Sequence, residues 1–324
     1  MQHPLHIIRN DELDSPQVAE MAVYLRMDDR SSRYRKFNMA RLLHIARGFF
    51  PVFAAFLLAV GVSGCANFDA VKKFATLSSD AANHAAVTGD YIGALDRRKQ
   101  YQPPVFHAEL DAQRMRREAQ QVSLDVLQQT MVGYMQALLG LTTGEIRTYD
   151  KWAINLGITL NKATLLTGDE KEAVASLSIL LVRGVTVVYR QNEIKKLIRD
   201  GNQPLQDIIK ATRKIVTRGI YADLQVESTL VSRYYDNFML APDNPPEPVA
   251  MALAREAKAE ALARVDSRIK GAQAYDIVLE KLAQAHQYLH EHRDRIGNNE
   301  LNEQFDPYID ELRYAYRNFV EITR

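Results

Sequence analysis

Residues 173–188 read AVASLSILLVRGVTVV, and this stretch decides the fold class. Arg183 is its only charged residue, so a helix built from it is apolar on nearly every side and has to lie among other helices. Thr167 and Glu170, just before the stretch, have the spacing of a capping box with Thr167 as the N-cap. We therefore expect a helix that begins after Thr167, continues to about residue 200 and occupies the centre of a helical bundle.

Apolar residues recur at helical spacing on both sides of this stretch. The further helices that we expect cover residues 67–98 (with a break near 78–80), 106–139, 145–165, 204–240, 249–293 and 307–324. The breaks between helices hold Pro103-Pro104, Thr142-Thr143-Gly144, Gly201-Asn202, residues 241–248 with four prolines, and Gly297-Asn298-Asn299. The sequence predicts an all-α fold, an antiparallel and elongated bundle of about seven helices. It forms one domain over residues 65–324, or two domains divided at the proline corner 241–248.

A second apolar run ends at Cys65, the only cysteine of the chain. Residues 49–65 read FFPVFAAFLLAVGVSGC, and Arg41 and Arg47 supply positive charge just before them. A positive flank, an apolar core and small residues before a processing point are the parts of a secretory signal. The run is shorter than the ~20 residues that a membrane-spanning helix needs. We therefore interpret residues 39–64 as a signal peptide.

The end of this run, Val62-Ser63-Gly64-Cys65, resembles the lipobox of bacterial lipoproteins, in which an aliphatic residue and two small residues precede a cysteine. The resemblance covers roughly residues 39–66. It implies cleavage after Gly64 and acylation of Cys65, and several acyl chains anchor a protein stably where one does not. In this family an aspartate after the cysteine favours the inner membrane. Ala66 therefore implies the outer membrane, with the chain facing the periplasm.

Residues 1–38 lack the character of a signal, since they are polar and of mixed charge. A start at Met39 gives MARLLHIARGFFPVF, which has the form of a signal start. We expect translation to begin at Met39. Residues 1–38 are then a mis-assigned extension or, if they are made, a disordered cytoplasmic tail, and either way they stand outside the fold.

Composition excludes several function classes. From residue 65 onward the chain carries 33 Lys and Arg against 34 Asp and Glu, so it lacks the basic excess that nucleic-acid binding requires. A single cysteine excludes disulfides, zinc–thiolate sites and, because it is the predicted lipidation site, cysteine catalysis. No nucleophile elbow, phosphate loop or dinucleotide fingerprint occurs in the sequence. We expect no catalytic residue, no bound metal and no cofactor.

Two clusters of polar residues are candidates for a site. His286, His290 and His292 lie in AHQYLHEHRDR; they either share a metal or, as we favour, complement the dipole at a solvated helix end. The second cluster is a basic loop before Pro103-Pro104, and its candidate partner-binding residues are Arg97, Arg98, Lys99 and Tyr101. Such a run is also typical of a solvated helix C-terminus. Tyrosines such as Tyr234-Tyr235 either line an interface or pack in the core.

These observations favour a non-catalytic lipoprotein of the outer membrane that works by binding an envelope protein. One alternative is a membrane-tethered immunity or inhibitor protein that neutralises a toxin. Others are a structural spacer in the envelope and a cell-wall-modifying enzyme. The nearest match to the Glu-Ser motif of all-helical lytic enzymes, Glu227-Ser228, lies in the middle of an expected helix.

The lipobox gives a first testable prediction. Replacing Cys65 by serine should abolish labelling with palmitate and leave the unprocessed precursor, because the acyl acceptor is lost. Ser63→Ala, which keeps a small residue in the lipobox, should be labelled and processed like the wild type. Equal labelling of the wild type and the Cys65→Ser variant would show that Cys65 is not acylated.

Overall fold

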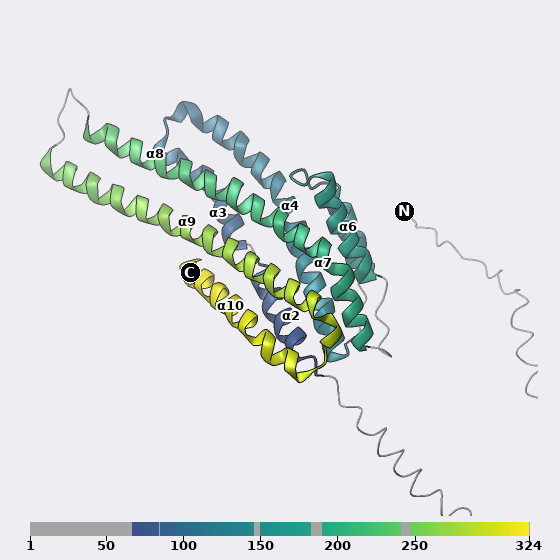
Figure 1. Ribbon diagram of the computed structural model, residues 1–324. Coiled ribbons are helices and arrows are strands. Elements are labelled where there is room, and N and C mark those ends of the chain that lie inside the picture. Colours follow the sequence, from purple (N-terminus) through teal and green to yellow (C-terminus); the bar gives the residue numbers. More distant parts are fainter. Residues whose placement is uncertain (1–66, 84, 146–149, 183–189, 241–246, 324) are drawn as a thin grey trace, which may run out of the picture. The chain divides into compact units, whose positions relative to one another are not determined.

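The computed structural model describes residues 67–83, 85–145, 150–182, 190–240 and 247–323 (Figure 1). Within these residues every regular element is a helix, so the fold is all-α as predicted. The lipobox with Cys65, the expected start at Met39 and most of the proline corner 241–248 lie outside the described residues. In the described part of the chain, no helix is both long enough and apolar enough to cross a membrane.

The helices follow one another along the chain with short connections. They are α2 (Asp69–Ala81), α3 (Ala85–Arg98), α4 (His107–Thr143), α5 (Asp150–Leu160), α6 (Gly168–Val182), α7 (Arg190–Lys214), α8 (Ala222–Met239), α9 (Pro248–Glu291) and α10 (Asn299–Thr323). Shorter helical turns are η1 (Lys99–Tyr101), η2 (Pro104–Phe106), the π-helical η4 (Ile215–Tyr221) and η5 (Arg293–Arg295). α4 runs four residues past its expected end at residue 139, through Thr142 and Thr143, and the predicted break falls at Gly144. Gly144 has a φ of 82°, a left-handed conformation that glycine adopts without strain.

The centre of the core is the C-terminal half of α4. Met131, Tyr134, Met135 and Leu138 are fully buried there, and α2, α6 and α7 all pack against this helix. The expectation that the apolar run 173–188 forms this centre is wrong for residues 173–182, the part of the run that the structure describes. α6 buries only one side of these residues, including Val174 and Leu177.

The outer side of α6 explains the difference. Ile179 and Val182 are exposed and, with Leu156 of α5, line an apolar groove of about 290 Å³. α6 and α7 are also two helices that pack against each other, where one continuous helix was predicted. The predicted capping box is confirmed, because Thr167 N donates to Glu170 Oε2 at 2.8 Å and Glu170 N donates to Thr167 Oγ1 at 3.3 Å.

Two predicted helix boundaries are wrong because tertiary contacts override local signals. α7 continues through Gly201, Asn202 and Pro204, although a proline inside a helix removes a backbone hydrogen bond. Gly201 is needed inside α7, since a Cβ there would lie 2.6 Å from the ring of Tyr134. Likewise α10 begins at Asn299, eight positions before the expected start at Pro307, and contains that proline.

A chain of hydrogen bonds links α4, α7 and α9 through the core. His286 of α9 is fully buried; its Nε2 lies 2.7 Å from the Tyr134 hydroxyl and its Nδ1 lies 2.9 Å from Asn202 Oδ1. Asn202 Nδ2 donates to Gln287 Oε1 at 2.9 Å, and Gln287 Nε2 donates to Glu291 Oε1 at 2.8 Å.

The carboxylate of Glu291 at the surface decides which atom donates at each step of these hydrogen bonds. Ionised Glu291 only accepts, so Gln287 and Asn202 both point their carbonyl oxygens inward. His286 therefore donates from Nδ1 to Asn202 and accepts at Nε2 from Tyr134. Both ring nitrogens are occupied while the ring is neutral, which excludes the solvated helix end that we favoured for this histidine. Burial lowers the pKa of His286 to about 3, and His290 adds to that effect.

Acid should therefore destabilise the fold. The unfolded chain protonates His286 near pH ~6.5, whereas the folded chain does so only near pH 3, so the free energy of unfolding falls as the pH drops below ~6.5. Between pH ~6.5 and ~5 the wild type should lose about 2 kcal/mol, measured by urea denaturation. His286→Gln should lack most of this loss, even if it is less stable at neutral pH. Equal pH dependence in both proteins would contradict the prediction.

Candidate functional site

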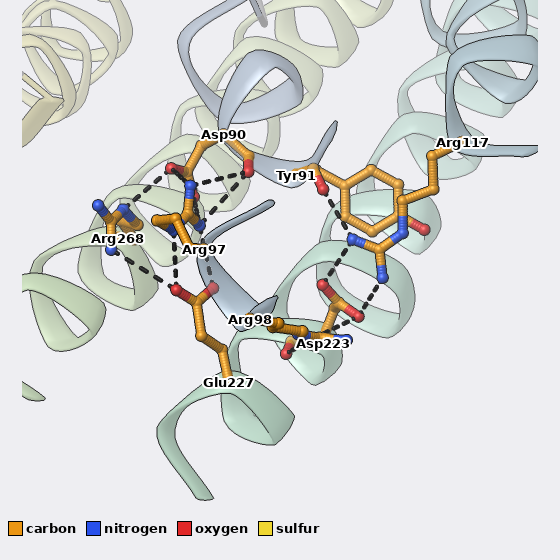
Figure 2. A network of polar contacts seen from close by, with 8 residues as sticks. All are labelled: Asp90, Tyr91, Arg97, Arg98, Arg117, Asp223, Glu227 and Arg268. Atoms are coloured by element: carbon orange, nitrogen blue, oxygen red, sulfur yellow. Dashed lines mark hydrogen bonds and ion pairs between the residues drawn. The ribbon is translucent and has the colours of Figure 1, made fainter. Parts of the chain in front are cut away.

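Charged side chains from four helices form one network (Figure 2). Its members are Asp90, Tyr91, Arg97 and Arg98 of α3, Arg117 of α4, Asp223 and Glu227 of α8, and Arg268 of α9. Taking an ion out of water costs several kcal/mol unless it is paired and hydrogen-bonded. The contacts of each group therefore decide what the network does.

Glu227 is the most deeply buried carboxylate, with 1% of its side chain exposed. Arg97 binds both of its oxygens, donating from Nε at 2.8 Å and from Nη2 at 3.0 Å. Arg268 lies 3.8 Å from the same carboxylate and 2.9 Å from Asp90, which also pairs with Arg97 at 3.0 Å. Burial raises the pKa of Asp90, and the two arginines oppose that rise. This half of the network joins α3, α8 and α9.

The second half is centred on Asp223. Arg98, with 5% of its surface exposed, donates from Nη2 to the Asp223 carbonyl oxygen at 2.6 Å and lies 2.7 Å from its carboxylate. Arg117 also binds the Asp223 carboxylate, with Nη1 at 2.8 Å. Its guanidinium lies 4.2 Å from the centre of the Tyr91 ring and donates to the Tyr91 carbonyl oxygen at 2.7 Å. This half joins α3 and α4 to α8.

The structure divides the predicted basic loop into two parts. Arg97 and Arg98 belong to the last turn of α3 and face the network, so the expectation that they are exposed on a loop is wrong. Lys99 lies outside the network and pairs with Asp111 and with Asp96. Tyr101 points to a surface cleft. Of these four residues, only Tyr101 is placed where a partner can meet it in a cavity.

This cleft lies between α8 and the segment η1–η2 and has a volume of about 870 Å³. Its lining residues are Gln100, Tyr101, Gln102, Pro103, Pro104, Phe106, Leu230, Arg233, Tyr234, Asn237 and Phe238. The five from α8 recur at helical spacing and so share one face of that helix. The sequence holds that spacing, but it does not show that Tyr101 faces it across the cleft.

Three tyrosines join the two walls of the cleft. Tyr101 lies 5.6 Å from Tyr234 with an interplanar angle of 74°, and 6.3 Å from Tyr235. Tyr234 and Tyr235 are nearly perpendicular, at 89°. Aromatic rings prefer such edge-to-face contacts. Tyr101 and Tyr235 also pack on a small second core of Val231, Ala261 and Val265, which fixes the base of the cleft.

His107 holds the η1–η2 wall in place. Its Nε2 lies 3.1 Å from both the Lys99 and the Gln102 carbonyl oxygens. Both partners are acceptors, so Nε2 carries the hydrogen and is shared between them. Phe106 N also donates to the Pro103 carbonyl oxygen at 3.0 Å. The wall is therefore a folded turn with its own hydrogen bonds.

Beyond the cleft, α8 and α9 form an antiparallel pair, because the ion pairs Glu227–Arg268 and Asp236–Lys258 step along the two helices in opposite directions. We call residues 232–240 and 247–260 the hairpin end. Among the residues of it that the structure describes, only Ala254 is buried. α10 ends beside Gly271 of α9, so it does not cover this part of the helix.

The hairpin end exposes large apolar side chains. They are Tyr234, Phe238, Leu240, Val249 and Leu253. In η2, Val105 and Phe106 are exposed as well, and Phe106 lines the cleft. Leu240 and Val105 are 78% and 79% exposed. Exposed apolar side chains that gather in one place mark interaction sites in soluble proteins, and Phe106, Tyr234 and Phe238 gather in the cleft. We therefore take the cleft and the hairpin end beside it as the candidate binding site.

The histidine cluster does not form a metal site in this structure. His286 uses both ring nitrogens inside the core, and His292 Nδ1 lies 2.9 Å from the Tyr288 carbonyl oxygen. Across the residues that the structure describes, no three His, Cys, Asp or Glu side chains are grouped so that they could hold a metal ion.

The network gives a stability prediction. Glu227→Gln should lower the free energy of unfolding by about 3 kcal/mol, because Arg97 and Arg268 then share only Asp90 in a buried setting. The matched control is Glu118→Gln, which breaks an exposed pair with Arg114 and should cost less than about 1 kcal/mol. Urea denaturation measures both. If both variants lose the same free energy of unfolding, the buried ion pair contributes no more to stability than the exposed one, and the prediction is wrong.

Comparison with protein-family models, with curated proteins and with solved structures gave no match to this chain. The case for a function therefore rests on the chain's own residues. The cleft and the apolar hairpin end are the features that bear on it most directly.

Proposed function

We propose that the chain is an outer-membrane lipoprotein whose helical part lies in the periplasm, binds an envelope protein and catalyses no reaction. One observation carries this proposal: exposed aromatic side chains line a preformed cleft, and the hairpin end of which they are part exposes further aliphatic side chains. Interfaces are built around tyrosine, tryptophan, phenylalanine and arginine, and Tyr234, Phe238 and Arg233 lie together on one face of α8.

The hairpin end buries few residues of its own, which supports the proposal that a partner covers it. Two helices alone bury too little surface to be stable in water, and here α8 and α9 bury only Ala254 beyond Val231 and Ala261. The pair continues for several turns past the second core. An envelope protein that covers Phe238 and Leu253 would remove their apolar surface from water, at about 25 cal/mol for each Å² buried.

The position of the predicted anchor fits this arrangement. Only Ala66 separates Cys65 from Asn67. The backbone N of Asn67 donates to the Gly297 carbonyl oxygen at 3.2 Å, just past the C-terminal end of α9. The hairpin end lies at the N-terminal end of the same helix, whose 44 residues span roughly 66 Å. A lipid on Cys65 would thus be far from the hairpin end, which would face the periplasm and not the bilayer.

Site-specific photo-crosslinking in intact bacteria tests the proposal. The crosslinking amino acid is placed at Phe238, in the cleft, or at Tyr314 of α10, which is 77% exposed and outside the cleft. We expect Phe238 to give one discrete adduct with another protein, and Tyr314 to give none of that size. Adding Phe106→Ala, on the opposite wall, should weaken the Phe238 adduct because it removes part of the contact surface.

Three results would contradict the proposal. An adduct with twice the mass of the chain would show that the hairpin end meets a second copy. Identical adducts from Phe238 and Tyr314, or an adduct at Phe238 that Phe106→Ala leaves unchanged, would show that the cleft is not the binding surface.

A further inference from the structure

We infer that the cleft takes an extended, proline-containing segment of the partner that carries an acidic residue. This inference rests on the proposed function and names the chemistry of its partner. Four features of the cleft carry it: its length, the angles between its rings, its free amide groups and its single charge.

The length of the cleft suits a short extended peptide. The residues of α8 that line it run from Leu230 to Phe238, eight positions that span roughly 12 Å at ~1.5 Å per residue. A polyproline II segment rises ~3.1 Å per residue, so about four residues fit along this face. That is the length of a Pro-x-x-Pro unit, which aromatic-lined grooves bind in other recognition domains.

The aromatic rings form an uneven wall and not a flat platform. Tyr101 meets Tyr234 at 74°, and Tyr234 meets Tyr235 at 89°. Because these rings already contact one another edge to face, a ligand meets only the parts of Tyr234, Phe106 and Phe238 that remain exposed in the cleft. Compact pyrrolidine rings can pack against such an uneven aromatic wall. Stacking of a sugar instead needs the open face of a ring, and these rings turn their edges and faces to one another. The geometry therefore favours a peptide over a glycan.

Polar side chains on the rim can satisfy an extended backbone. A polyproline II segment makes no internal hydrogen bonds, so its carbonyl oxygens need donors from the protein or from water. Gln100, Gln102 and Asn237 line the cleft, and their side-chain amides make no hydrogen bond to any residue that the structure describes. Their NH₂ groups are thus available to a ligand.

Arg233 supplies the charge. It is the one ionisable side chain with a full charge among the described residues that line the cleft, and it has no ion pair within the described part of the chain. By contrast Lys258 and Asp236, close by on the hairpin end, pair with each other at 2.7 Å. An acidic residue beside the proline unit of the ligand would give Arg233 an ion-pair partner.

The cleft is also formed before any ligand arrives. His107 and the Phe106–Pro103 hydrogen bond hold the η1–η2 wall, and Pro103 already has the extended angles φ −55° and ψ 146°. The opposite wall is a helix. A rigid site loses little entropy on binding, and a proline-containing ligand likewise loses little because its backbone is already restricted.

Peptide binding to the full-length protein in detergent tests the inference. The probe is a fluorescein-labelled ten-residue peptide with a Pro-x-x-Pro unit and one glutamate beside it. Control peptides replace the prolines by alanine or the glutamate by lysine, and an oligomer of N-acetylglucosamine serves as competitor. Fluorescence anisotropy should show binding at least about tenfold tighter than to the alanine peptide, and Tyr234→Ala should weaken binding by about the same factor.

A charge exchange makes the test specific. Arg233→Glu should reverse the preference, so that the lysine peptide binds more tightly than the glutamate peptide. Arg317→Glu, which changes an exposed arginine of α10 outside the cleft and the hairpin end, should leave the preference of the wild type unchanged. An unchanged preference in Arg233→Glu, or equal binding of the proline and alanine peptides, would overturn the inference.

The outcomes separate this inference from the proposed function. A specific protein adduct at Phe238 without any preference for the proline peptide would leave the binding function standing and reject the proline ligand. Binding of the sugar oligomer with no binding of peptide would assign the cleft to a glycan. Peptide binding that survives Tyr234→Ala and Phe238→Ala together would place it outside the cleft and overturn the inference.

Discussion

The bond between Arg97 and Glu227 fixes the register on which the candidate site depends. Arg97, in the last turn of α3, lies four positions before Tyr101 of η1, and Glu227 lies two turns of α8 before Tyr234. When the guanidinium holds both oxygens of the carboxylate, at 2.8 and 3.0 Å, the two tyrosines are brought to ring-centre distances of 5.6 Å. Sliding α8 by one turn, about 5.4 Å, would break this bidentate pair and separate the walls of the cleft.

Apolar residues in place of the network would hold the helices together as well, since buried ion pairs are often no more stable than well-packed hydrophobic replacements. They would fix the register less strictly, because apolar contacts have no preferred direction. The planar fork of arginine accepts only a narrow range of carboxylate positions. We therefore infer that the main effect of the network is to fix the position of α8 along α3. The chain of hydrogen bonds from Tyr134 through His286 to Asn202 does the same deeper in the bundle, where both ring nitrogens of His286 have a partner.

The sequence predicts the fold class, most helices and the capping box at Thr167, because hydrophobic periodicity and capping are local properties. Prediction from the sequence is wrong where contacts between residues far apart in the sequence decide the structure. Gly201 and Pro204 are local signals for a break, yet the ring of Tyr134, 67 positions earlier, occupies the space that Gly201 leaves. Arg97 and Arg98 have the composition of a solvated helix end, and only the distant Asp223 and Glu227 turn them inward. Of the candidate site, the tyrosines and Pro103-Pro104 stand out in the sequence, whereas Arg233 and Asn237 do not.

Packing falls off from the core toward the candidate site, and this gradient links the fold to its use. α4, α7 and α9 share a dense core around Tyr134, the network joins α3 and α8 to it, and beyond the network only a small cluster around Val231 remains. Segments with few buried contacts open most easily, and a partner that binds them adds its own free energy to the native state. The network lies between the dense core and the sparsely packed hairpin end. It keeps the cleft walls in register while the hairpin end retains the unburied surface that a partner can cover.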